Sequence, residues 1–190
     1  MKNRILKRWV VGGITFLLIW TLPLSAFCQK ASIKEVSLKG TDGVWKVGFY
    51  VMDCFTEKME EAIRTGMQTI FTYYLHVYQK RTWWKDRKVA SMEFHHTIQY
   101  DPIRNEYHVS LEENGSSIVT ANIEEAKKRM ARVEGVEIRP SSQLNPGVPT
   151  YLRIKAELDP VRLPLHLEYL FFFVSLWDFE TDWHTEPLPP

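Results

Sequence analysis

Three side chains near the middle of the chain could contribute to a metal site: Glu93, His95 and His96. A structural zinc ion needs four such ligands. Successive residues of a β-strand point to opposite faces, so His95 and His96 cannot easily bind one ion. Glu93 and His95 share a face, but a third ligand would have to come from elsewhere, such as His108 on the next strand. The pattern therefore favours a polar surface and one core histidine over a metal site.

Four carboxylates could act in acid–base catalysis: Asp101, Asp159, Asp178 and Glu180. Asp178 and Glu180 are two residues apart on an expected strand, which places them on one face. Such a pair works as acid and base only when burial raises the pKa of one member. Turns and edge strands are exposed to solvent, so we expect no such rise there. The motifs of serine hydrolases, zinc proteases, P-loop proteins and CxxC redox proteins are all missing. We therefore expect no catalytic residue, no cofactor and no bound metal.

The sequence RTWWKDRK, residues 81–88, contains the best candidate for a contact surface. Trp83 and Trp84 are flanked there by the basic residues Arg81, Lys85 and Arg87. Tryptophan suits both a membrane interface and the centre of a protein interface, and the cations would favour anionic lipid. The alternative is structural, with both rings covering the edge of a sheet.

Hydrophobic periodicity predicts the elements that carry these side chains. Alternation of apolar and polar residues indicates strands at residues 32–38, 44–52, 67–80, 89–100, 107–111, 116–120, 136–139, 151–159 and 177–186. The segment at residues 136–139 is short and only weakly marked. Residues 67–80 are apolar on both faces, as in a central strand covered on both sides. Helices are expected at residues 57–64, 123–132 and 164–172. We expect Thr56 to cap the first helix, and a capping box of Asn122 and Glu125 to open the second.

Tight turns between neighbouring strands indicate antiparallel pairing, in contrast to the alternation of strands and helices in a parallel sheet. The predicted fold class is therefore mainly β (α+β). We expect an antiparallel β-sandwich-like domain of about eight strands with two or three short helices.

The N-terminal residues 1–28 have the pattern of a secretory signal peptide. A basic segment precedes an apolar run at residues 9–22, which is short for a membrane-spanning helix. Cleavage is expected between Cys28 and Gln29, with cleavage after Ala26 or an uncleaved membrane anchor as alternatives. The expected organisation is a signal peptide, a single mostly-β domain at residues 29–186 and a proline-rich tail at residues 187–190.

Charge and cysteine content narrow the class of partner. The first 28 residues hold four of the 24 basic residues and none of the 23 acidic ones, so the rest of the chain is slightly acidic. This balance argues against nucleic acid as a partner. Cleavage before Gln29 would leave Cys54 alone, and cleavage after Ala26 would allow a disulfide between Cys28 and Cys54. A lone Cys54 is expected to be a small buried hydrophobe.

Several segments together resemble one bacterial exported family. They are RTWWKDRKVAS, QYDPIRNEYHV, the helix NIEEAKKRMARV, the late segment SLWDFETDW and the helix end EEAIRTG. In this order and spacing, the chain is similar to the family called domain of unknown function 4390 over roughly residues 33–186. The resemblance implies no activity, cofactor or catalytic residue.

We therefore expect an exported protein of the cell envelope, in the periplasm, and anchored to the membrane if its N-terminal segment is not cleaved. The function expected first is a non-catalytic protein-binding or scaffold module at or near the membrane, with an envelope protein as partner and a contact to the membrane surface as a further option. The alternative is a periplasmic carrier or sensor of an apolar ligand such as a lipid. An envelope hydrolase is the reading that the sequence favours least.

Overall fold

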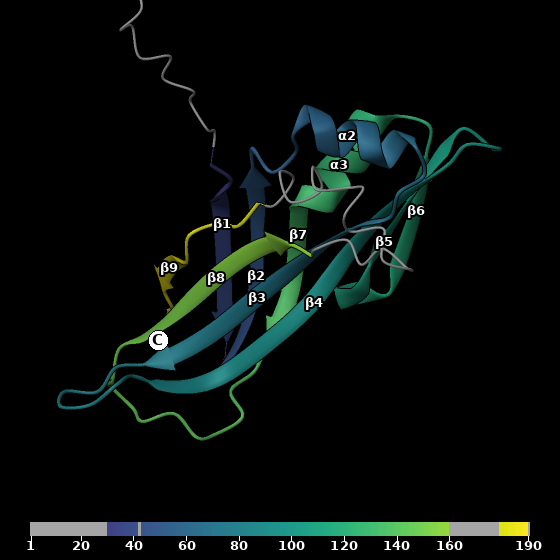
Figure 1. The fold of residues 1–190 in the computed structure, drawn as a ribbon. Helices are drawn as coiled ribbons and strands as arrows, with labels where there is room; N and C mark the ends of the chain where they lie inside the picture. The colour runs from purple at the N-terminus through teal and green to yellow at the C-terminus, as the bar shows by residue number, and fades with distance from the viewer. Residues whose placement is uncertain (1–29, 42, 160–178, 190) are drawn as a thin grey trace, which may run out of the picture.

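The computed structural model describes residues 30–41, 43–159 and 179–189. In this part of the chain, two antiparallel sheets face each other and two α-helices lie together at one end of the sheets (Figure 1). The predicted mainly-β antiparallel fold is therefore confirmed. The predicted signal peptide and the predicted helix at residues 164–172 lie outside the described residues, as do Trp177 and Asp178.

The larger sheet has six strands in the order β6-β5-β4-β3-β8-β9. Its strands are β3 (Thr69–Gln79), β4 (Arg87–Asp101), β5 (Glu106–Leu111), β6 (Ser116–Thr120), β8 (Thr150–Leu158) and β9 (His184–Pro187). Strand β3 is central, as predicted, and pairs with β4 on one side and β8 on the other. Its inner face is buried, whereas Tyr74, His76 and Tyr78 on its outer face are half-buried among the described residues.

The smaller sheet consists of β1 (Ser32–Thr41), β2 (Val44–Met52) and β7 (Arg132–Ile138), in that order. The inner faces of both sheets carry the alternating apolar residues, which pack into one core. For example, the rings of Phe49 on β2 and Tyr73 on β3 meet edge to face with their centroids 5.7 Å apart. The period of two that predicted the strands thus also predicted which side chains are buried.

Two helices, α2 (Glu57–Arg64) and α3 (Ile123–Ala131), and the short 3₁₀ helix η1 (Glu112–Asn114) complete the fold. Thr56 caps α2 as predicted, because its hydroxyl accepts from the amide of Met59. Asn122 caps α3 through the amide of Glu124. The expected capping box is wrong in one part: the Glu125 carboxylate accepts from the Thr120 hydroxyl. None of the helices among the described residues is long and apolar enough to cross a membrane.

The C-terminal boundary also differs from the expected one. Pro187 belongs to β9, and Leu188 is buried, with its amide donating to the carbonyl of Thr150. The domain therefore continues past residue 186, because burial of one leucine side chain and one backbone hydrogen bond hold the start of the expected tail.

Candidate functional site

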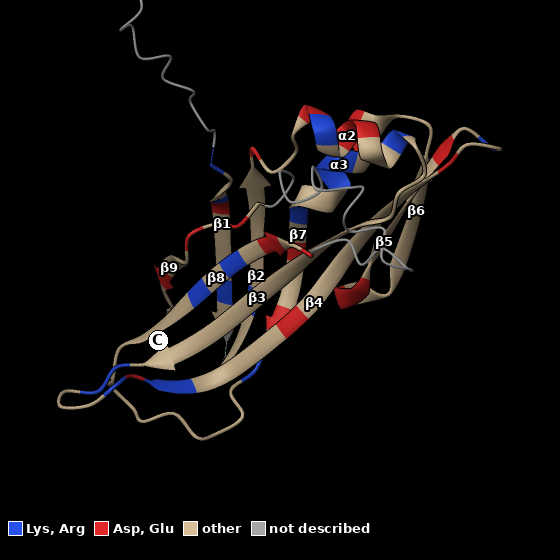
Figure 2. Ribbon diagram, viewed as in Figure 1, with Lys and Arg blue, Asp and Glu red and all other residues tan. Residues whose placement is uncertain are grey.

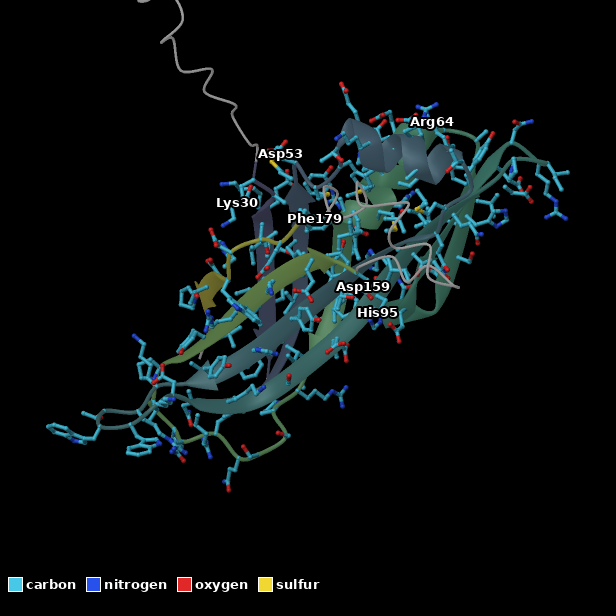
Figure 3. All side chains as sticks on the ribbon, viewed as in Figure 1. Lys30, Asp53, Arg64, His95, Asp159 and Phe179 are labelled. Atoms are coloured by element: carbon cyan, nitrogen blue, oxygen red, sulfur yellow. The ribbon has the colours of Figure 1, made fainter. Side chains whose placement is uncertain are left out.

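Trp83 and Trp84 lie at the tip of the hairpin that joins β3 to β4. Their exposed fractions are 94% and 76%. The alternative in which both rings cover the sheet edge is therefore wrong. Figure 3 shows side chains of this tip projecting beyond the body of the sheets. A large exposed aromatic pair is unusual on a soluble domain and marks a candidate binding surface.

The base of this hairpin is held firmly by Gln79, which is 2% exposed. The Gln79 side-chain oxygen accepts from Arg87 at 2.8 Å and from the amide of Asn145 at 3.1 Å, and its Nε2 donates to the carbonyl of Asn145 at 2.9 Å. The amide of Lys80 donates to the carbonyl of Pro149. The loop before β8 thus braces the hairpin, so the exposed rings stand on a rigid base.

Asp86 closes the base from the other side of the loop. Its two carboxylate oxygens accept from the amide of Arg81 at 3.1 Å and from the hydroxyl of Tyr151 at 2.6 Å. The Tyr151 hydroxyl and the Arg81 amide lower the pKa of Asp86, because both bonds favour the charged carboxylate. Burial and the same bond to Asp86 raise the pKa of Tyr151 to about 12. Asp86 is thus an ionised brace within the loop.

Two hollows flank the base of the hairpin. One, of about 500 Å³, is lined by Lys80, Asp86, Tyr151 and Arg153 together with residues of the preceding loop and β9. The other, of about 400 Å³, lies around Trp45 and includes the apolar side chains Leu144, Val148 and Leu188. A basic groove and an apolar groove therefore both open at the end of the domain that carries the exposed tryptophans.

The outer face of the large sheet continues the basic character. The guanidinium of Arg153 lies 4.8 Å from the centre of the Trp183 ring, and that ring packs on His76 at 4.9 Å. Trp183 therefore lies on the outer face and is half-buried. Burial, then the charges of Lys88 and Arg153, lower the pKa of His76. Burial is the larger cause, and the two nearby cations add to it.

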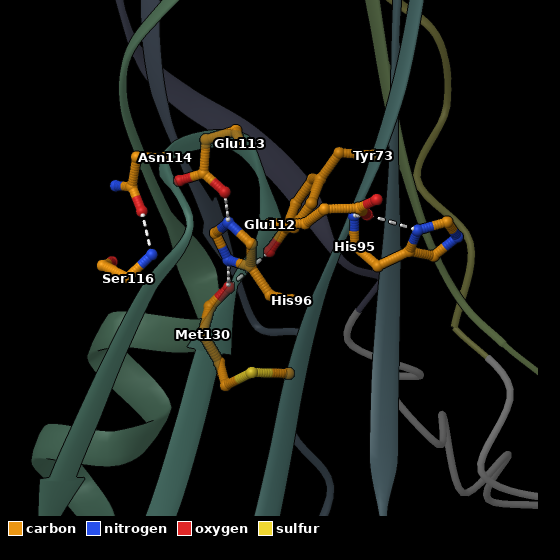
Figure 4. Close-up of polar contacts among 8 residues, drawn as sticks. All are labelled: Tyr73, His95, His96, Glu112, Glu113, Asn114, Ser116 and Met130. Atoms are coloured by element: carbon orange, nitrogen blue, oxygen red, sulfur yellow. Dashed lines mark hydrogen bonds and ion pairs between the residues drawn. The ribbon is translucent and has the colours of Figure 1, made fainter.

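A second polar cluster is buried near the helices (Figure 4). His96 is 0% exposed, its Nδ1 donates to the carbonyl of Met130 at 2.8 Å, and its Nε2 lies 2.9 Å from the carboxylate of Glu113. The hydroxyl of Tyr73 donates to the same Met130 carbonyl. The predicted core histidine is confirmed, and its contacts join β4, α3, η1 and β3. These contacts tie the four elements together inside the domain.

The neighbouring His95 points to the opposite face, as predicted (Figure 4). Its Nδ1 and its amide contact the carboxylate of Glu112 at 2.7 and 2.8 Å. These two bonds lower the pKa of Glu112. His108 lies instead beside Glu106, at 3.2 Å. The described residues contain no group of three side chains that could hold a metal ion.

The remaining candidate groups have structural contacts. Asp101 accepts from the amides of Ile103 and Arg104 in the β4–β5 turn, and Asp159 accepts from the Thr72 hydroxyl. Glu180 is exposed and pairs with Lys155 at 2.7 Å.

Cys54 is buried, and within the described residues it has no disulfide partner. Burial raises the pKa of its thiol to about 12, which disfavours the thiolate that a nucleophile or redox group needs. The prediction of a buried hydrophobe is therefore confirmed.

Sequence reasoning missed the residues that build the surroundings of the tip, namely Gln79, Tyr151, Arg153 and Trp183. Their partners are distant along the chain: Tyr151 contacts Asp86 and Trp183 contacts His76. Neither periodicity nor a local motif indicates such pairs.

Comparison with known proteins gives one finding. A family model described as Domain of unknown function (DUF4390) matches residues 28–187. No curated protein and no solved structure matches the chain.

Proposed function

The chain belongs to the DUF4390 family, and because that family's description assigns no activity, we propose a function from the surface of the domain itself. The protein is a non-catalytic binding or scaffold module of the bacterial cell envelope. It is exported through residues 1–28 and makes its contact, at or near the membrane, through the tip of the β3–β4 hairpin. Its expected partner is an envelope component.

The observation that carries this proposal is the exposure of Trp83 and Trp84 on a braced base. Burying one tryptophan ring against a partner would contribute on the order of 4 kcal/mol. Gln79 and Asp86 fix the backbone on both sides of the tip, so little order would have to be gained on binding. Two large rings held out in water in this way suit a contact surface far better than a core.

The non-catalytic part of the proposal draws on the contacts of the candidate acids and of the thiol. Asp101 and Asp159 accept hydrogen bonds that stabilise turns and strand ends, and the Cys54 thiol is kept protonated by burial. The export part draws on the basic and apolar pattern of residues 1–28. The family match begins at Cys28, the last residue of the predicted signal peptide, which agrees with this division.

The test is site-specific photo-crosslinking in living cells, with the crosslinker placed at Trp83 or, as a matched control, at Ile103. Ile103 is 91% exposed, lies in the β4–β5 turn and is not part of the hairpin tip. We expect an adduct with one predominant envelope component from position 83 and none of it from position 103. The same adducts from both positions, or none from either, would refute the proposed function.

The apolar groove around Trp45, Leu144 and Leu188 favours a second candidate, a carrier or sensor of an apolar ligand. Native mass spectrometry of the purified protein would decide it. A bound lipid that is lost in a Leu144→Asp variant would support this second function, and the bare protein mass alone would count against it.

A further inference from the structure

The charge around the hairpin tip is strongly one-sided. Residues 80–88 contain five cations, Lys80, Arg81, Lys85, Arg87 and Lys88, and a single carboxylate, Asp86. Both oxygens of that carboxylate accept hydrogen bonds from within the domain. Figure 2 shows basic residues on the hairpin, on the start of β4 and on β8, whereas both signs mix on the helices at the other end. The tip therefore presents a positive surface.

Among the described residues, several cations at this end of the domain have no partner of opposite charge. Elsewhere on the domain lysines pair with carboxylates, as Lys46 does with Glu137 and Lys127 with Glu60. In the part of the chain that the structure describes, Lys80, Lys88 and Arg153 have no carboxylate within 4.0 Å. Unpaired cations around one surface attract an anionic partner.

The basic groove at the base of the hairpin could hold an anionic group of limited size. Lys80, Arg153 and Thr185 line it, together with Asp86, whose carboxylate already accepts two hydrogen bonds from within the domain. Arg153 and Thr185 are register partners on β8 and β9. Trp183 packs against the guanidinium of Arg153, so the cation is held on the groove side of the sheet. Two cations and a hydroxyl that line one groove are donors from which a phosphate group can accept.

The shape of the tip favours a membrane surface over a protein as the partner. A protein interface buries its central tryptophans in a fitted pocket within a broad flat area of about 800 Å² on each side. Here the two rings stand on a narrow projecting loop, exposed in almost every direction. A fluid interface can surround such a loop without a pocket, and tryptophan prefers the headgroup level of a bilayer. Basic residues beside it add attraction to anionic lipid.

We propose that this end of the domain binds an anionic phospholipid surface, with Trp83 and Trp84 at headgroup level and a lipid phosphate in the groove between Lys80 and Arg153. This inference rests on the proposed function and specifies its partner. The long hairpin then stands on the membrane, and the helical end points away from it (Figure 1).

The experiment is vesicle flotation with the protein purified from cells that express the full chain. Vesicles of phosphatidylcholine and phosphatidylglycerol in equal parts are compared with vesicles of phosphatidylcholine alone. The variants are Trp83→Ala/Trp84→Ala, Lys80→Gln/Arg153→Gln and the control Ile103→Ala. All share the same N-terminus, so any contribution of that segment is common to them. Circular dichroism confirms that each variant is folded.

We expect binding to the anionic vesicles only, and weakening with added salt because exposed charges are screened. Both double variants should bind at least about tenfold more weakly, since each removes two of the contacts that the surface supplies. The Ile103→Ala variant should bind like the wild type. Equal binding to neutral vesicles, or double variants that bind like the wild type, would overturn the inference.

The two proposals fail in different ways. If the vesicles are not bound but the crosslinker at position 83 captures one envelope protein in cells, the lipid inference is wrong and the proposed function stands. If position 83 gives no specific adduct in cells, the proposed function itself is wrong.

Discussion

His96 and Glu113 form a pair sealed inside the domain, with exposed fractions of 0% and 4% for their side chains and 2.9 Å between Nε2 and Oε2. The other ring nitrogen faces the carbonyl of Met130, which can only accept. The imidazole therefore donates from Nδ1, while Nε2 contacts the Glu113 carboxylate. The pair ties η1 to β4 at the place where the helices meet the sheet.

Removing one member of this pair should destabilise the domain strongly. Glu113→Ala leaves the buried Nε2 of His96 without a partner, and breaking a buried pair in this way costs about 3 kcal/mol. The control is Glu112→Ala, which removes an exposed partner of His95 and should cost under about 1 kcal/mol. Urea denaturation measures both free energies of unfolding. Equal losses in the two variants would contradict the structural role of the pair.

The Tyr73 hydroxyl should contribute less, because it shares its acceptor. Tyr73→Phe removes one of the two donors to the Met130 carbonyl, while His96 still occupies that oxygen. We expect a loss of about 1 kcal/mol, measured by thermal or urea unfolding. Tyr100→Phe, which removes an exposed hydroxyl bonded to Asn105, serves as the comparison and should be nearly neutral. A larger effect from Tyr100→Phe would contradict this ordering.

Cys54 should make the domain less stable in alkali. Burial raises the pKa of the folded thiol from its ordinary value of 9.0 to about 12. The unfolded thiol therefore loses its proton first, so stability is full below about pH 9 and falls as the pH rises toward 12. Unfolding free energies measured at increasing pH should fall less steeply for Cys54→Ala than for the wild type. Identical slopes would show that the thiol does not contribute.

The hydrogen bond from Tyr151 to Asp86 at the hairpin base should affect the pKa of Asp86. Tyr151→Phe removes the larger of the two bonds that lower the pKa of this carboxyl, so the pKa should rise toward its ordinary value. Because the folded pKa is lowered, the carboxylate stabilises the fold above its unfolded pKa and ceases to do so as the pH falls through the folded value. Carboxyl chemical shifts followed by NMR against pH measure the change. An unshifted titration curve would show that Tyr151 does not hold Asp86.

The sequence predicted what depends on local periodicity. The alternation in β4 correctly predicted one core histidine, which is His96, and the caps Thr56 and Asn122 follow from short-range chemistry. Glu113 could not be predicted as buried, because in sequence it belongs to a charged turn and its partner His96 lies on another strand.

The sequence predicted which residue types form the candidate site, but not whether they are exposed. The tryptophans and cations of residues 81–88 were visible in sequence, but the choice between a covered and an exposed loop was not. That choice depends on whether the loop folds back over the sheet. Here Gln79 and Tyr151, bonded to distant residues, hold the base of the hairpin so that it projects.

Lys30 and the exposed tryptophans lie at opposite ends of the domain. Lys30 precedes β1 at the end where Ser32 pairs with Met52, whereas the tip of the β3–β4 hairpin lies at the other end of the sheets (Figures 1 and 3). The ten residues of β1 alone span about 33 Å. A chain that is still anchored to a bilayer just before Lys30 would hold Trp83 and Trp84 away from that bilayer. A chain that has been cleaved there could insert the same tryptophans into the bilayer. Processing of the N-terminus would therefore decide which surface the tryptophans reach.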